Sequence, residues 1–350
     1  MNFASDNTAG IAPEILEAIG RANEGFALGY GNDAWTRGIE ARIAEVFGRE
    51  VAVFLVPTGT AANALAVAHF SPPWGALLCH AESHLAVDEC GAPEFFGGGL
   101  KLMPLPGEAG KIAPETLTGA LALGRGAPHS VTPSVLSLTQ ATEVGTVYTA
   151  AETRTLADIA HARGLAVHMD GARLGNALVR LGLTPAQATW QAGVDVLSFG
   201  ATKGGAMAAE AIVFFDPARA AGMDSRRKRG GHLVSKHRFA AAQFEAYLHD
   251  DLWLRLARRA NDAADRLAAR LAAVQVHPVW PVEANEVFVA LFKGADARLK
   301  AAGAMYYPWP TEGLPRNAVV GQDRVLVRLV TSFATTDVEI DRFATLAGSA

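Results

Sequence analysis

Seven short, mainly apolar runs of residues alternate with helical stretches through the first two thirds of this chain. The runs occupy positions 51–55, 76–80, 100–103, 135–138, 165–169, 194–199 and 211–215. Continuous apolar runs of this length are typical of strands that are covered on both faces, and helices between them allow neighbouring strands to run parallel. The pattern predicts an α/β fold built on a mostly parallel seven-stranded sheet.

The character of the chain changes after position 215. A charged segment is followed by an Ala-, Leu- and Arg-rich helical stretch at 238–273, by apolar runs near 274–277, 286–291 and 325–331, and by a closing helix from about Asp337. Short strands between helices predict a small C-terminal α+β domain. We expect an N-terminal arm at 1–35, a large domain at 36–240, and a linking helix with the small domain at 241–350.

Charge and composition narrow the functional classes. The 350 residues carry a formal net charge of −4 and no long basic run, which argues against nucleic acid or an anionic membrane as a partner. We find no signal-peptide pattern and no apolar stretch long enough to span a membrane. Cys79 and Cys90 are too few for a disulfide framework and lack companions at metal-ligand spacing. We therefore expect a cytoplasmic protein without a metal site.

Asp170 and Lys203 follow two of the predicted strands, at the edge where open α/β sheets place their ligands. A lysine amine can bond covalently to the aldehyde of pyridoxal phosphate, and a carboxylate can keep the pyridine nitrogen protonated so that the ring accepts electrons. Taken singly, Asp170 could be a helix N-cap and Lys203 a solvent-facing lysine. Small residues on both sides of Lys203 would leave room for a bulky cofactor, so the pair predicts a pyridoxal phosphate enzyme.

The turn after the first predicted strand is a candidate phosphate site. Thr58, Gly59 and Thr60 join that strand to a helix, where a close backbone approach, hydroxyl groups and first-turn amides can hold an anion. The alternative is a threonine N-cap with nothing bound.

Three further side chains are candidates for contacts with the pyridine ring or with a substrate. His84 could stack on the pyridine face, although a hydrogen-bonded loop histidine is the simpler interpretation. Arg173 and Arg328 could grip a substrate carboxylate, since guanidinium groups match carboxylates with two hydrogen bonds. A surface ion pair is the alternative for Arg173.

The chain resembles the low-specificity L-threonine aldolase family, of the aspartate-aminotransferase-like type I pyridoxal phosphate fold, and within it the branch with phenylserine aldolases. The resemblance covers nearly the whole chain. It is carried in order by Ser5-Asp6-Asn7, Tyr30-Gly31-Asn32-Asp33, Pro57-Thr58-Gly59-Thr60-Ala61-Ala62-Asn63, the His84 segment, Met169-Asp170-Gly171-Ala172-Arg173, Thr202-Lys203 and Arg328-Leu329-Val330-Thr331.

The resemblance implies a role for each matching residue. Lys203 would carry pyridoxal phosphate, Asp170 would pair with the ring nitrogen, and His84 would stack on the ring. The other implied ligands are Gly59, Thr60 and Thr202 for the phosphate, and Ser5, Arg173 and Arg328 for the amino-acid carboxylate. It also implies a homotetramer, a dimer of dimers whose sites are lined by two subunits, with Tyr30 and the 230–231 loop coming from the neighbour.

Two departures from the family pattern bear on mechanism. Where many members have Glu-Asn-Thr-His-Asn, this chain has Thr139-Gln140-Ala141-Thr142-Glu143, so Thr142 stands in the place of a histidine that contacts the substrate hydroxyl. The basic residue that usually follows the double glycine has no clear match, and Lys236 is the candidate to replace it.

The reaction implied is retro-aldol cleavage of L-threonine, L-allo-threonine or a related β-hydroxy-α-amino acid to glycine and an aldehyde. We expect His84, or a water held by His84 and Thr142, to take the hydroxyl proton. The alternatives are another reaction of a type I pyridoxal phosphate enzyme on a small amino acid (β-elimination, amino transfer or racemisation) and a non-catalytic regulator that binds pyridoxal phosphate or phosphate. The presence of Lys203 and the lack of an added DNA-binding module argue against the regulator.

Overall fold

One large sheet organises the first two thirds of the molecule. The computed structural model describes residues 1–123, 128–316 and 318–348. Within these residues seven strands form a sheet in the order β1-β7-β6-β5-β4-β2-β3. They are β1 (Ala52–Val56), β2 (Gly75–His80), β3 (Lys101–Leu105), β4 (Thr132–Thr139), β5 (Ala166–Gly171), β6 (Val196–Gly200) and β7 (Glu210–Phe214). Only β7 runs antiparallel to its neighbours, which confirms the predicted mostly parallel sheet.

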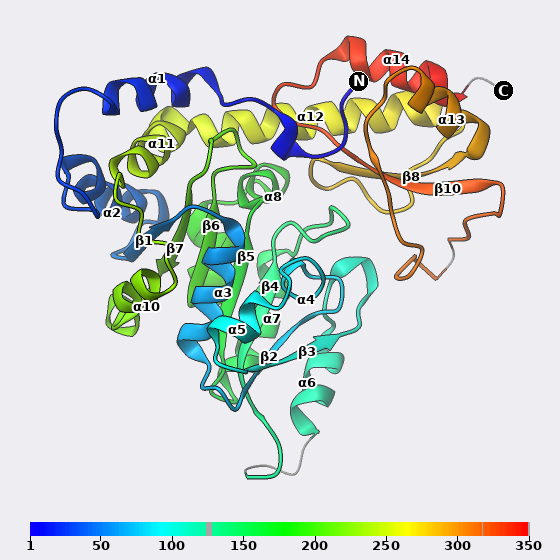
Figure 1. Ribbon diagram of the computed structural model, residues 1–350. Coiled ribbons are helices and arrows are strands. Elements are labelled where there is room, and N and C mark those ends of the chain that lie inside the picture. Colours follow the sequence, from blue (N-terminus) through cyan, green and yellow to red (C-terminus); the bar gives the residue numbers. More distant parts are fainter. Residues whose placement is uncertain (124–127, 317, 349–350) are drawn as a thin grey trace.

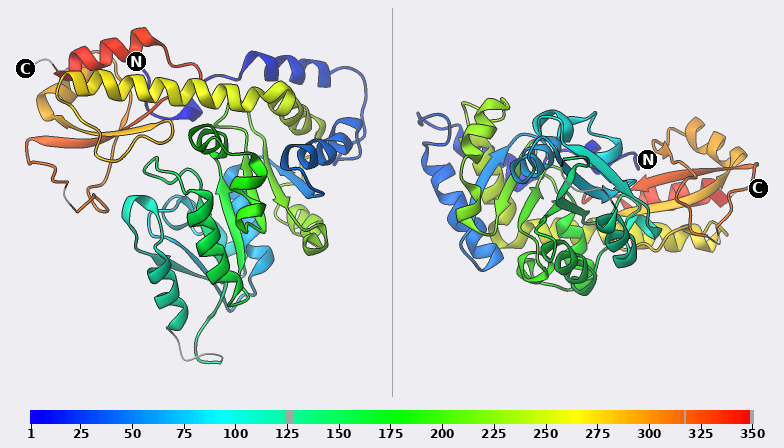
Figure 2. Two further views of the ribbon diagram at one scale, coloured as in Figure 1. Left: turned by 180° about the vertical axis from the view of Figure 1, so that it is seen from behind. Right: turned by 90° about the horizontal axis from the view of Figure 1, so that it is seen from below.

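Helices cover both faces of this sheet, and this explains why the strands are mainly apolar. Leu55 and Val213 pack into a core shared with α2 and α7, whereas their neighbours Phe54 and Ile212 pack into a second core under α3. Figures 1 and 2 show α3 on one face and α7 on the other. The helices of this part are α1 (Pro13–Ala22), α2 (Ala34–Phe47), α3 (Gly59–Phe70), α4 (His84–Val87), α5 (Ala92–Phe96), α6 (Pro114–Ala122), α7 (Ala150–His161), α8 (Leu174–Leu181), α9 (Pro185–Ala188), α10 (Met223–Arg229) and α11 (Arg238–Leu248).

A smaller antiparallel sheet forms the C-terminal part, in the order β8-β10-β9. Its elements are β8 (Glu286–Phe292), β9 (Tyr307–Pro308), β10 (Arg324–Val330), α13 (Lys293–Ala301) and α14 (Asp337–Gly348). The strand expected near 274–277 is absent from this described segment. The chain turns there with Gln275 at a φ of 63°, and pairing is limited to an isolated bridge from Pro278, which has no amide hydrogen to donate.

The long helix α12 (Leu252–Ala273) joins the two parts and packs against both α8 and α14 (Figure 1). The helical stretch expected at 238–273 is divided between α11 and α12, because Asp250 and Asp251 adopt left-handed backbone conformations between them. The N-terminal residues are anchored to the smaller part, where Phe3 exchanges backbone hydrogen bonds with Met305 and Val330.

Candidate active site

A cavity of about 640 Å³ lies at the carboxyl edge of the large sheet. Its walls come from the segments that follow β1, β2, β4, β5 and β6 and from the start of the antiparallel β7, all of which reach the same edge. The chemically active side chains that line it are Thr58, Thr60, Asn63, His84, Glu143, Asp170, Arg173, Thr202, Lys203 and Glu210. Most of the residues singled out in the sequence are thereby brought together.

Asp170 and Lys203 line this cavity from adjacent strands, β5 and β6. Asp170 is buried, and its carboxylate accepts hydrogen bonds from Asn63 Nδ2 at 2.8 Å and from the Ala172 amide at 3.0 Å. Lys203 is half-buried in the turn after β6. The next residue, Gly204, is required by packing, because a Cβ there would lie 2.1 Å from the Tyr247 hydroxyl. Its small size is therefore explained without a cofactor.

The start of α3 forms another wall of the cavity. Thr58 caps the helix by accepting a hydrogen bond from the Ala61 amide at 3.1 Å, so its side chain serves the helix. A Cβ built on Gly59 would meet nothing within 4 Å, which leaves the backbone open to an incoming group. First-turn amides lack helical carbonyl partners and favour anions. This open helix start, with a lysine and a buried carboxylate in the same cavity, fits pyridoxal phosphate.

A buried hydrogen-bonded chain connects His84 with Asp170. Glu89 Oε1 lies 3.0 Å from His84 Nδ1 and accepts from Asn63 Nδ2 at 2.9 Å, and Asn63 also donates to Asp170. The hydrogen bond to Glu89 raises the pKa of His84, and burial raises the pKa of Glu89. Both shifts favour the protonated form of the pair. The proton shared by His84 and Glu89 is therefore retained to a higher pH than a free histidine would retain it.

The two candidate arginines flank a buried glutamate. Arg173 lines the cavity and donates through Nε to Asp6 at 2.8 Å, and its Nη2 lies 3.3 Å from Glu286 Oε1. Arg328 lies behind Glu286, with Nη1 3.9 Å from the same oxygen and its guanidinium over the Trp309 ring. Arg173 therefore faces the cavity, whereas Arg328 does not line it.

Ser5 and Tyr30 also lie outside the cavity lining. Ser5 caps a short 3-10 turn by accepting from the Asn7 amide at 3.2 Å, and Asn7 is the residue of that segment that lines the cavity. Tyr30 is exposed, and its ring lies 4.5 Å below Lys228 Nζ.

Thr142 is not placed where a substrate hydroxyl could reach it. It is fully buried, and its hydroxyl lies 2.8 Å from that of Thr146 and donates to the Ala109 carbonyl. The turn from Thr142 to Thr146 directs this side chain inward and leaves the next residue, Glu143, lining the cavity. Thr142 does not line the cavity, so this arrangement gives no support to a water held by His84 and Thr142.

The site contains residues that the sequence reasoning did not single out. Asn63 and Glu89 form the link to His84, Asp6 and Glu286 hold the arginines, and the buried Glu210 lines the cavity. Burial raises the pKa of Glu210 to about 7. An asparagine within an otherwise Ala-rich apolar helix was the available signal for Asn63. The partners of Glu89 and Glu286 come from distant segments, which no local pattern reveals.

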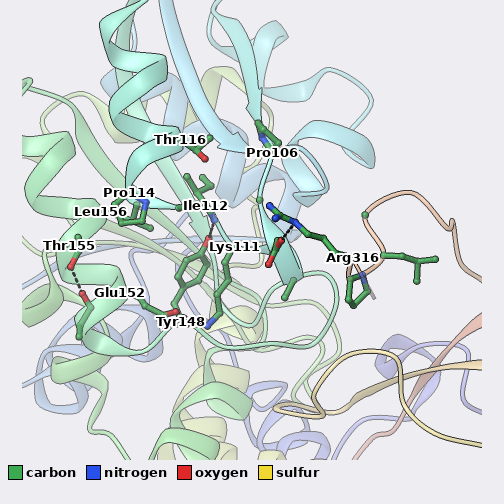
Figure 3. A pocket seen from close by; sticks show the side chains of 18 residues that line it. Pro106, Lys111, Ile112, Pro114, Thr116, Tyr148, Glu152, Thr155, Leu156 and Arg316 are labelled. Carbon is green, nitrogen blue, oxygen red and sulfur yellow. Dashed lines mark hydrogen bonds and ion pairs between the residues drawn. The ribbon is translucent and has the colours of Figure 1, made fainter. Parts of the chain in front are cut away.

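A second cavity, of about 960 Å³, lies between α6, α7 and the loop at 313–316 (Figure 3). Its charged residues are already paired, since Lys111 bonds to Glu152 at 3.0 Å and Arg316 to Glu108 at 2.6 Å. It lacks Lys203 and Asp170. Across residues 1–123, 128–316 and 318–348, no group of three or more His, Cys, Asp or Glu side chains could hold a metal, and no helix is long and apolar enough to cross a membrane.

Comparisons with known proteins agree on one family. Residues 2–293 match the family described as beta-eliminating lyase. A low-specificity L-threonine aldolase of Pseudomonas aeruginosa is 44% identical over 312 residues, which cover 89% of this chain and 90% of the relative. The same activity is named for a Pseudomonas sp. protein that is 41% identical over 312 residues, again covering 89% and 90%.

Solved structures extend the likeness to the fold. A threonine aldolase of Leishmania major has a TM-score of 0.91 at 29% identity, covering 99% of this chain and 98% of that one. A serine palmitoyltransferase of S. paucimobilis with bound PLP has a TM-score of 0.72 at 16% identity, covering 99% and 86%. The second likeness shows the fold alone.

Proposed function

Because this chain belongs to the beta-eliminating lyase family and to its low-specificity L-threonine aldolases, we propose that it cleaves L-threonine and related β-hydroxy-α-amino acids to glycine and an aldehyde. It is a carbon–carbon lyase that depends on pyridoxal phosphate. The structural observation that carries the proposal is the meeting of Lys203 and Asp170, from neighbouring strands, in one cavity beside an open helix start.

Four parts of the site would hold the cofactor. Lys203 would bind its aldehyde carbon and Asp170 its ring nitrogen, while Gly59, Thr60 and Thr202 would hold the phosphate and His84 would stack on the ring. When bound, pyridoxal phosphate supplies an electron-withdrawing ring that stabilises negative charge on the substrate α-carbon. The hydrogen bonds from Asn63 and Ala172 fix the Asp170 carboxylate in place.

Arg173 is the proposed anchor for the substrate carboxylate. Asp6 and Glu286 hold its guanidinium in position, so little side-chain freedom would be lost when substrate binds. We include Arg328 and Ser5 as further carboxylate ligands: Arg328 shares Glu286 with Arg173, and Ser5 precedes Asn7 on the cavity wall. Fixing the carboxylate and the amine orients the Cα–Cβ bond for cleavage.

The assembly we propose is a homotetramer, a dimer of dimers with each site at a subunit boundary. Phe26, Leu28 and Tyr30 expose large apolar side chains within one loop, which favours a partner surface there. In such an assembly Tyr30 would line the site of a second copy. We place the enzyme in the cytoplasm, because the thiols of Cys79 and Cys90 are free.

The test is a substrate panel on the purified protein, with Lys203→Ala as the negative control. L-Threonine, L-allo-threonine and phenylserine should each be assayed for glycine and the matching aldehyde. The family description also favours β-elimination as a second candidate function, which would yield a keto acid and ammonia. Keto acid and ammonia without glycine would overturn the aldolase proposal.

A further inference from the structure

Cleavage of a β-hydroxy amino acid needs a group that takes the hydroxyl proton, and the two candidates named from the sequence are both engaged in contacts with other side chains or the backbone. Thr142 is fully buried and bonded to Thr146 and to the Ala109 carbonyl. His84 shares a proton with Glu89 through Nδ1, and its Nε2 lies 3.6 Å from Asp88 Oδ2. Each ring nitrogen of His84 therefore faces a carboxylate.

Three other acidic groups line the cavity, and two of them are engaged. Asp170 accepts from Asn63 and from the Ala172 amide. Glu210 is buried, and its Oε1 lies 3.4 Å from the Thr202 amide nitrogen. The third, Glu143, is half-buried on the wall formed by the turn after β4. Within the described residues its carboxylate has no hydrogen-bond or ion-pair partner.

Glu143 lines the same cavity as the two proposed substrate-site residues, His84 and Arg173. After the hydrogen bond to Glu89, the charge of Glu143 also raises the pKa of His84. Burial lowers the pKa of Arg173, but Asp6, Glu286 and Glu143 together raise it. The charge of Glu143 also acts on two neighbouring acids, Glu82 and Glu286. The pKa of each is raised mainly by burial and further by Glu143. Glu143, the proposed ring-stacking residue His84 and the proposed carboxylate anchor Arg173 thus line one cavity, and the charge of Glu143 acts on both of the others.

We propose that Glu143 is the catalytic base of the aldol cleavage, an inference that rests on the function proposed above. The hydroxyl proton passes to a Glu143 carboxylate oxygen, and the O–H electron pair becomes the second C–O bond of the aldehyde. The Cα–Cβ pair stays with the α-carbon, which takes up a proton to give glycine. Half-exposure of Glu143 lets it return its proton to water.

Glycine can serve as a substrate whose reaction uses the same site but needs no base to deprotonate a hydroxyl group. Exchange of its α-hydrogen in D2O, followed by NMR, requires the cofactor, Lys203 and the carboxylate anchor. In Glu143→Gln, kcat for cleavage should fall roughly 10²–10⁴-fold. Glycine exchange, glycine affinity by absorbance titration and cofactor content should stay unchanged. Glu82→Gln removes another half-buried acid close to Glu143 and should cleave substrate like the wild type.

A second variant keeps the test decisive if Glu143→Gln loses its cofactor or fold. Glu143→Ala should recover cleavage when formate is added, but not when chloride is added at the same ionic strength. Wild-type cleavage rates in Glu143→Gln would overturn the base role, and so would a parallel loss of cleavage and glycine exchange. A wild type that exchanges glycine but cleaves no β-hydroxy amino acid would overturn the proposed function, and the base role with it.

Discussion

At the scale of single residues, the site is defined by how its charges are paired. Asp170, Glu89 and Arg173 are each held by at least one short hydrogen bond, whereas Glu143 and Lys203 are left to meet ligands. Charges that are buried and paired position other groups, and a partly exposed charge without a partner is the one that is available for chemistry.

Glu89→Gln should lower the pKa of His84, because it removes the buried negative charge 3.0 Å from Nδ1. A raised folded-state pKa stabilises the protein below the free histidine value, about 6.5, and that contribution is lost as pH rises through the folded pKa. The variant's deficit in unfolding free energy should therefore be larger at about pH 5 than at about pH 9. Histidine resonances in NMR titrations measure the pKa directly.

His161 supplies the internal control for that experiment. Its ring bonds to Asp195 at 2.9 Å, on another part of the large sheet, and its pKa is raised by that bond. The His161 titration should be the same in both proteins. An unchanged His84 titration in Glu89→Gln would contradict the proposed coupling.

At the scale of elements, the close approach of β5 and β6 holds Asp170 beside Lys203. Gly200 ends β6, and a Cβ there would lie 2.9 Å from the Cα of Ala172 and 3.1 Å from its carbonyl oxygen. Both contacts are with backbone, which cannot rotate away as a side chain could. The glycine therefore sets the spacing of the two strand ends.

Gly200→Ala should cost about 1–3 kcal/mol of unfolding free energy, the usual penalty of overpacking, and should weaken cofactor binding. Gly119 on α6 is the matched control, since an added Cβ there meets nothing within 4 Å. Gly119→Ala should raise stability, because alanine is favoured over glycine inside a helix. Urea denaturation of both variants measures the difference, and equal stabilities would refute the spacing argument.

The same elements show what sequence reasoning can predict. The strands of the large sheet were predictable because both of their faces are covered, and Asp170 and Lys203 because parallel strands present their carboxyl ends at one edge. The break at Asp250 and the turn at 274–275 have no strong Gly or Pro signal and were not foreseen. The inward direction of Thr142, which leaves Glu143 lining the cavity, depends on contacts with Ala109 and Thr146 that a local pattern does not reveal.

At the scale of the whole molecule, the site depends on the N-terminal segment, the large sheet and the small sheet, although only the first two parts line the cavity. Asp6 joins all three, accepting from Arg173 at 2.8 Å and from Asn285 Nδ2 at 3.2 Å. Burial alone would raise the pKa of Asp6, but Arg173 and Lys203 lower it below its ordinary value. The N-terminal segment is thus part of the site.

Asp6→Asn should destabilise the protein at neutral pH by less than the roughly 3–5 kcal/mol expected when one partner of a buried ion pair is removed, because Glu286 still faces Arg173. An acid whose pKa is lowered by folding stabilises the protein at pH values above its unfolded-state pKa. This contribution is lost as the pH falls through the folded-state pKa. The difference in unfolding free energy between variant and wild type should therefore become smaller on acidification. A gap in urea-unfolding free energy that does not depend on pH would contradict this account.

The covalent attachment site of the cofactor tests the central claim most directly. Reduction of the purified holoenzyme with borohydride, followed by proteolysis and mass spectrometry, fixes the cofactor on the lysine that holds it. We predict the added mass on Lys203 alone, and its loss in Lys203→Ala. Labelling of another lysine, or a protein without pyridoxal phosphate that still cleaves L-threonine, would contradict the account.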